Sequence, residues 1–164
     1  MANKIKALVD SAFIPPAFNI GVKALTLRDL ENLDRLYRLG IVEFYYTDIV
    51  WVEIIPKIIR EYRRRNMKLP LSRIIEVVSV LRKTFEHVKV DEHAVAEAFK
   101  LKQLGHPDMI DNILYGIALR NNMYLLTLDL EFRNFLKKHN LKYNMLITHQ
   151  ELFGKIERQD FKSY

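Results

Sequence analysis

Four acidic side chains stand where a ligand could be bound. Asp10 and Asp129 each follow a short apolar run, whereas Glu53 and Asp111 lie early in segments of helical periodicity. Carboxylates that pack together repel one another, and burial strengthens the repulsion. A hard dication such as Mg²⁺ removes this conflict, because it prefers oxygen ligands and binds a few carboxylates together with substrate phosphates. The four acids therefore indicate a metal site that activates water and stabilises an in-line phosphoryl displacement.

Each acid also has a local interpretation that involves no ligand. Asp10 suits the turn after a strand, Asp111 suits the reciprocal half of a capping box, and Asp129 suits the N-cap of the helix that follows it. Glu53 is the hardest to explain in this way, because its neighbours at 50–55 are apolar. A lone carboxylate in such a segment must reach solvent or find a partner. The metal interpretation thus depends on the four acids taken together.

The stretch from residue 105 to residue 129 shows how the fold would place two of these acids. Asp108 is a typical N-cap, and apolar residues follow at helical spacing. The run at 123–126 is typical of a buried parallel strand. Asp111 would then lie in the first turn of a helix, and Asp129 just beyond the carboxyl end of a strand. In open α/β sheets, that edge is where ligands bind.

Strands and helices alternate along the chain. Their alternation is typical of a parallel sheet covered by helices on both faces. We therefore expect an α/β fold, a three-layer α/β/α sandwich with a central parallel sheet of about five strands. The predicted strands are residues 5–9, 41–46, 87–90, 123–126 and 143–147.

Several local signals set the expected helix boundaries. Thr26 and the segment 148–151 open capping boxes, and Gly40 and Gly105 would end helices. Thr47 and Asp48 would cap the helix that carries Glu53, and Pro56 would kink or divide that helix. The helix that follows Pro70 would turn four residues inward: Ile74, Ile75, Val78 and Leu81.

Length and composition bound the class of protein. The 164 residues fit one domain, which we place at 1–153, followed by a tail at 154–164 with little apolar content. The chain has no cysteine, so disulfides and thiolate metal sites are excluded. We see no apolar run of membrane-spanning length and no signal peptide, and therefore expect a cytoplasmic protein without a membrane partner. The net charge of +6 favours a polyanionic partner.

A basic run at 60–65 is a candidate contact for such a partner. Arg60, Arg63 and Arg64 recur at helical spacing and are our candidate nucleic-acid-binding residues. A solvated helix face explains the same run without any ligand and is the interpretation we favour slightly. The five histidines show no ligand spacing, so we expect surface or packing roles for them.

The order of these features resembles the PIN-domain nucleases, a family that includes the toxin subunits of VapBC-type toxin–antitoxin systems. The resemblance rests on the Val-Asp-Ser at 9–11, on Glu53, and on the segments 111–118 and 126–129, with Thr127 two residues before Asp129. It extends from the first strand to Glu151. Pro56 and a longer irregular segment at 15–24 depart from the compact toxins.

The resemblance implies Mg²⁺- or Mn²⁺-dependent hydrolysis of phosphodiester bonds, most often of RNA. It carries both the catalytic and the metal-binding roles onto Asp10, Glu53, Asp111 and Asp129. Ser11, Asp108 and Thr127 would have supporting roles, Asp108 as a fifth acid beside Asp111 and Thr127 as a residue that holds the cluster. The family also implies an RNA substrate, a homodimer and an antitoxin protein as partner.

Two other functions are compatible with these residues. A catalytically silent protein of the same fold would bind RNA or protein as a scaffold, and loss of one or more acids is its usual sign; here all four are present. A phosphoryl-accepting signalling domain that uses Asp10 would need a paired acid beside it and a lysine after the last strand, where the chain has Thr148 and His149. Metal-carboxylate chemistry leaves DNA open as a substrate.

Overall fold

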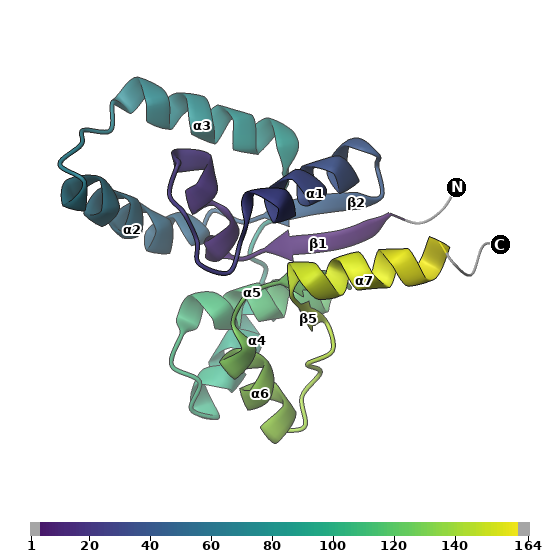
Figure 1. Ribbon diagram of the computed structural model, residues 1–164. Helices are drawn as coiled ribbons and strands as arrows, with labels where there is room; N and C mark the ends of the chain where they lie inside the picture. Colours follow the sequence, from purple (N-terminus) through teal and green to yellow (C-terminus); the bar gives the residue numbers. More distant parts are fainter. Residues whose placement is uncertain (1–3, 161–164) are drawn as a thin grey trace.

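The computed structural model describes residues 4–160, which form a central sheet of five parallel strands in the order β3-β2-β1-β4-β5 (Figure 1). Central β1 pairs with β2 on one side and with β4 on the other, so that Ala7 lies opposite both Phe44 and Tyr124. The parallel three-layer fold predicted from the sequence is confirmed. The strands are β1 Ile5–Val9, β2 Val42–Tyr46, β3 Glu86–His87, β4 Tyr124–Leu126 and β5 Leu146–Ile147.

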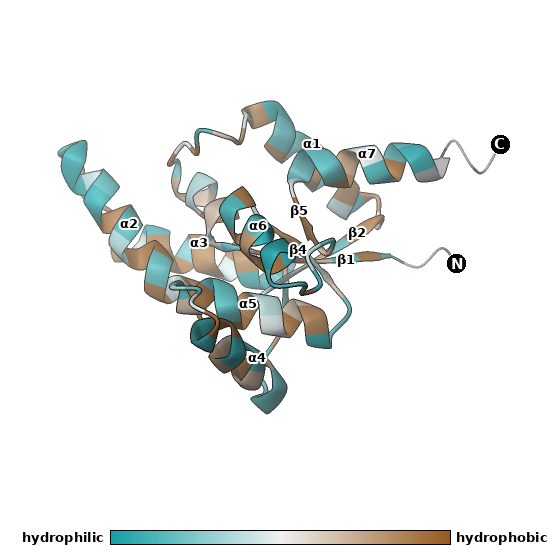
Figure 2. Cartoon of the chain, turned by 90° about the horizontal axis from the view of Figure 1, so that it is seen from below, coloured by the Kyte–Doolittle hydropathy of each residue, from teal (hydrophilic) through white to brown (hydrophobic). Residues whose placement is uncertain are grey.

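Helices cover both faces of the sheet. Strand residues alternate between the two faces, so that Leu8 enters one core while Ala7 and Val9 enter the other. The first core takes side chains from α2 to α6 and the second from α1 and α7; Figure 2 shows α1 and α7 on one side of the strands and α4 and α5 on the other. The helices are η1 Ser11–Phe13, η2 Pro15–Phe18, α1 Leu27–Arg38, α2 Val50–Arg64, α3 Leu71–Thr84, α4 Glu92–Gln103, α5 Met109–Arg120, α6 Leu130–Lys138 and α7 His149–Asp160.

Most of the predicted helix boundaries are confirmed. The capping box at Thr26 is present, and Thr148 and Glu151 exchange reciprocal hydrogen bonds at the start of α7. Gly40 and Gly105 have positive φ angles just beyond α1 and α4, as the left-handed end of a helix requires. Local chemistry thus decides where these helices begin and end.

The predictions for α2 and α3 need correction at three points. Pro56 does not divide α2, which continues to Arg64; the carbonyl that Pro56 leaves unpaired lies on the exposed side of the helix, where water can satisfy it. The residue at the N-cap of α2 is Ile49, and no side chain caps this end. On α3, Ile74, Val78 and Leu81 are partly buried as predicted, but Ile75 is 67% exposed and Val77 is buried in its place.

The predicted third and fifth strands are shorter in the structure, each reduced to two residues. These are the edge strands, which have a hydrogen-bonding partner on one side only. Beyond these strands the chain leaves the sheet: the backbone N–H of Val88 still donates to the carbonyl of Tyr46, whereas the side chain of Tyr143 is exposed.

The C-terminal helix α7 crosses the expected domain boundary between residues 153 and 154. Ile156, beyond this boundary, is buried in the core with Leu152. The last part of the expected tail, residues 161–164, lies outside the described residues. Within residues 4–160, none of the helices combines the length and apolar character needed to cross a membrane.

Candidate metal site at the carboxyl edge of the sheet

Two of the predicted site residues follow neighbouring strands. Val9 of β1 pairs with Leu126 of β4, so Asp10 and Thr127, the next residues, lie side by side at the carboxyl edge of the sheet. The backbone N–H of Asp10 donates to the carbonyl of Leu126 at 3.1 Å. Asp10 is only 7% exposed and accepts hydrogen bonds from the backbone N–H of Ala12, at 2.8 Å, and from the Thr127 side chain.

Thr127 joins two acids. Besides its bond to Asp10, its hydroxyl oxygen accepts from the backbone N–H of Asp129 at 3.0 Å. Asp129 in turn caps α6, since its carboxylate accepts from the backbone N–H of Phe132 at 2.9 Å. The threonine that the sequence singled out therefore lies between Asp10 and Asp129.

Asp111 and Asp108 reach the same edge from the start of α5. Asp108 is the N-cap and accepts from the backbone N–H groups of Ile110, at 2.9 Å, and Asp111, at 3.1 Å. The pKa of Asp111 is raised to about 7, chiefly by burial and in smaller part by the negative charges of Asp108, Asp10, Asp129 and Glu53. Because such interactions weaken with distance, this influence on Asp111 agrees with the placement of the five acids around the carboxyl edge of the sheet.

Glu53 is held by contacts from two directions. The hydroxyl of Ser11 donates to its Oε2 at 2.7 Å, and the ammonium of Lys57 contacts its Oε1. Ser11 lies in η1, directly after Asp10, so this bond joins the end of β1 to α2. Glu53, although it lies in an apolar segment, therefore has the hydrogen-bonding partners that a carboxylate in such a segment needs.

The pKa of Asp10 is raised to about 6. Burial is the main cause, and the charge of Glu53 adds to it, whereas the hydrogen bonds from Thr127 and Ala12 act in the opposite direction. Burial and neighbouring negative charge therefore disfavour the ionised form of both Asp10 and Asp111.

This arrangement fits a hard cation by its chemistry. The converging donors are carboxylate and hydroxyl oxygens, the ligands that Mg²⁺ and Mn²⁺ prefer. As the side chains lie, no three acidic or histidine side chains within residues 4–160 meet closely enough to chelate one ion. Glu53 is engaged with Ser11 and Lys57 instead. A bound cation would need this carboxylate to shift, and it would relieve the repulsion that raises the pKa of Asp111.

The candidate arginines lie on α2, which leads away from Glu53. Arg60, Arg63 and Arg64 are all exposed. Arg64 makes two bonds to Glu61, at 2.5 and 3.1 Å, whereas we find no ion pair for Arg60 or Arg63 in the described part of the chain. Two positive side chains thus remain free to meet a polyanion.

Two residues that organise the site were missed at the sequence level. Asn112 is fully buried beside Asp111, and its Oδ1 lies 2.7 Å from Nδ1 of buried His106, whose ring stacks on Phe132. A polar residue in an otherwise apolar helix face was the available signal. Lys57, four residues after Glu53, was the signal for a helical ion pair.

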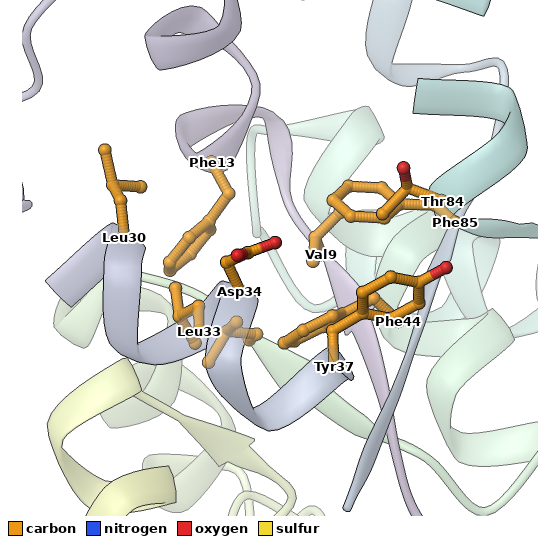
Figure 3. A pocket seen from close by; sticks show the side chains of 10 residues that line it. Val9, Phe13, Leu30, Leu33, Asp34, Tyr37, Phe44, Thr84 and Phe85 are labelled. Atoms are coloured by element: carbon orange, nitrogen blue, oxygen red, sulfur yellow. The ribbon is translucent and has the colours of Figure 1, made fainter. Parts of the chain in front are cut away.

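A cavity on the other face of the sheet holds none of the converging acids. Its volume is about 150 Å³, and mainly apolar side chains line it, among them Val9, Phe13 and Phe44 (Figure 3). Val9 and Leu126 in this lining directly precede Asp10 and Thr127. The cavity and the acids therefore lie on opposite sides of the same two strand ends.

The protein is an α/β protein whose five parallel strands have the order β3-β2-β1-β4-β5. Its candidate site is a group of acids at the carboxyl edge of this sheet. A family model described as PIN domain matches residues 19–138, and the chain belongs to the PIN domain family. The match includes Glu53, Asp111 and Asp129, while Asp10 precedes it. No curated protein matches the chain.

Solved structures support the same fold. The chain is similar to PAE2754 from Pyrobaculum aerophilum, with 14% identity and a TM-score of 0.57, over 95% of this chain and 99% of that one. It is also similar to VapBC2 from Rickettsia felis, solved bound to a DNA fragment from their promoter, with 13% identity and a TM-score of 0.54, over 88% of this chain and 97% of that one. At these identities the likeness concerns the fold.

Proposed function

We propose that this protein is a metal-dependent endoribonuclease that hydrolyses RNA phosphodiester bonds at the carboxyl edge of its sheet. The observation that carries the proposal is that Asp10, Thr127 and Asp129 meet at the carboxyl edge of the sheet, where nearby acids also raise the pKa of Asp111. Repulsion of this kind costs stability unless a cation or a proton is bound. Membership of the PIN domain family supports the same chemistry.

In this proposal Asp10, Asp111 and Asp129 would hold Mg²⁺ or Mn²⁺, and Glu53 would bind the ion or orient the attacking water. The ion would supply a water of lowered pKa and positive charge beside the phosphate. Thr127 fixes the spacing of Asp10 and Asp129, and Ser11 fixes Glu53. Asp108 adds negative charge beside Asp111. Arg60, Arg63 and Arg64 would attract the substrate.

The test is cleavage of end-labelled single-stranded RNA and DNA with Mg²⁺, with Mn²⁺ and with EDTA. We expect cleavage of RNA that requires metal and that Asp111→Asn lowers by at least about 100-fold. Cleavage that survives this substitution would contradict the proposal. If neither polymer is cleaved and no metal raises the melting temperature, the scaffold function replaces the enzyme.

We further propose a homodimer and, from the resemblance to VapBC toxins, an antitoxin protein as a partner in the cytoplasm. Exposed apolar residues of α4, Val95 and Phe99, offer a surface for such contacts. Light scattering of the purified protein tests the dimer: a monomer mass at micromolar concentration would contradict it. Co-purification with the product of a neighbouring gene tests the antitoxin.

A further inference from the structure

A row of positively charged residues runs along α2 on the same side of the helix as Glu53. A helix turns by about 100° and rises by about 1.5 Å per residue. Lys57, Arg60 and Arg64 therefore lie within about 40° of the direction of Glu53 and extend to about 16 Å from it along the helix axis. We call these three residues the cationic flank.

The first member of the cationic flank is held at the site itself. Lys57 contacts Oε1 of Glu53 while Ser11 occupies Oε2, so both oxygens of this carboxylate are engaged. The Lys57 side chain remains 47% exposed. Its ammonium thus lies at the border between the acidic cluster and solvent, where a substrate phosphate could replace Glu53 as its partner.

The other two members add positive charge further out. Arg60 is exposed and has no ion pair among the described residues. Arg64 shares Glu61 with Arg65, whose guanidinium also donates to the backbone carbonyl of Asn19 at 3.0 Å. Because one carboxylate serves two arginines, a net positive charge remains at this end of α2.

The opposite flank of α2 has a different character. Val52, Ile55 and Ile59 recur there at helical spacing and are exposed. Arg63 lies between the two flanks, about 80° around the helix from Glu53. The side of α2 that carries Glu53 is therefore positively charged, and the side opposite the cationic flank is apolar.

We propose that the cationic flank binds successive phosphates of a single-stranded RNA whose scissile phosphate lies at the acidic edge. Lys57 exchanges Glu53 for a phosphate when RNA binds, and Arg60 and Arg64 bind phosphates further along the strand. A straight row of cations suits an extended single strand, whose binding depends strongly on backbone charge. The inference rests on the proposed function and specifies which residues guide its substrate.

The experiment measures RNA binding separately from cleavage. Fluorescence anisotropy with a labelled single-stranded RNA would be recorded in EDTA across a range of salt concentrations, in an Asp111→Asn background. We expect Lys57→Gln and Arg60→Gln each to weaken binding about three- to tenfold and to lower the slope of log K against log salt by about 0.7. Glu53→Gln, which releases Lys57, is expected to tighten binding.

A control variant shows whether the effect is specific to the cationic flank. Arg38→Gln removes an exposed arginine that also pairs at i,i+4, with Asp34 on α1, and is expected to leave affinity unchanged. An equal loss with Arg38→Gln would show that binding depends only on overall positive charge and would overturn the cationic flank. Unchanged binding in Lys57→Gln and Arg60→Gln would overturn it too, even if the wild type cleaves RNA. If the flank variants weaken binding but the wild type never cleaves, the inference stands and the proposed hydrolysis fails.

Discussion

The hydroxyl of Ser11 and the carboxylate of Glu53 lie 2.7 Å apart, although 42 residues separate them in the chain. Ser11 belongs to the turn that follows β1, and Glu53 to the first turn of α2, the helix after β2. The contact therefore fixes one predicted metal ligand relative to the segment that carries another, Asp10.

Removal of this hydroxyl should lower activity more than stability. Ser11→Ala leaves Glu53 with Lys57 as its remaining partner, and loss of a bond that orients a metal ligand typically costs about 10- to 100-fold in activity or metal affinity. We expect kcat to fall by about tenfold, with an unfolding free energy within about 1.5 kcal/mol of the wild type. Single-turnover cleavage and urea unfolding would check this. Ser79→Ala, an exposed site on α3, is the control.

The raised pKa values of Asp10 and Asp111 predict how stability depends on pH. Both are above the ordinary value of 3.8, at about 6 and about 7, so the folded protein binds protons more tightly than the unfolded chain. Their stabilising effect is complete below about pH 4 and is lost as pH rises through 6 and 7. We expect the melting temperature of the metal-free protein to fall between pH 5 and pH 8.

The comparison with Asp111→Asn isolates this effect. The substitution removes one titrating group and one repelling charge, so the fall between pH 5 and pH 8 should become smaller. At pH 8 the variant should be more stable than the metal-free wild type by about 1–3 kcal/mol, or roughly 3–10 °C. Calorimetry in EDTA gives both values. Parallel pH profiles for the two proteins would contradict the assignment.

Gly116 limits the distance between α4 and α5. A Cβ atom at this position would lie 2.6 Å from the carbonyl oxygen of Ala94, so Gly116→Ala must push the two backbones apart. We expect a loss of about 1–3 kcal/mol in unfolding free energy, since overpacking of a tight core costs this much. The control is Gly154→Ala in α7, where a Cβ meets nothing within 4 Å. That substitution should stabilise by about 0.5–1 kcal/mol because it favours the helix.

The buried pair of Asn112 and His106 should support the start of α5. Asn112→Ala leaves the ring nitrogen of His106 without its partner at 2.7 Å, and an unsatisfied buried group costs about 1–3 kcal/mol. Chemical unfolding would measure the loss, with Asn134→Ala, an exposed residue on α6, as its control. A loss no larger than that of the control would show that the pair contributes no stability.

Much of the fold could be predicted from the sequence because its signals are local. The alternation of apolar strands and periodic helices indicated a parallel sheet, and Asp108 and Asp129 each cap a helix as their positions suggested. The approach of Asp10 to Thr127 followed from the rule that parallel strands end at one edge. The edge strands were less predictable, because an apolar residue such as Tyr143 can stay exposed outside the sheet although its type suits a strand.

The contacts of Glu53 could not be predicted in the same way. Its bond to Ser11 depends on how α2 packs against the segment after β1, and this packing follows from the tertiary fold. One residue of the stripe that α3 buries was misassigned for a related reason: Ile75 and Val77 are both apolar, and only the position of the helix decides which is covered. Candidate site residues at strand ends were therefore easier to place in the fold than the contacts that they make.

Asp10, Asp108 and Asp129 share one further property, since each accepts a backbone N–H at the start of a helix, in η1, α5 and α6 respectively. Their orientation therefore lasts only as long as those first helical turns do. Helix ends open locally at a much lower free energy than the whole domain. Fraying of a single turn would release an acid from its place while both cores stay intact, which provides a route for ligand exchange that requires no movement of the sheet.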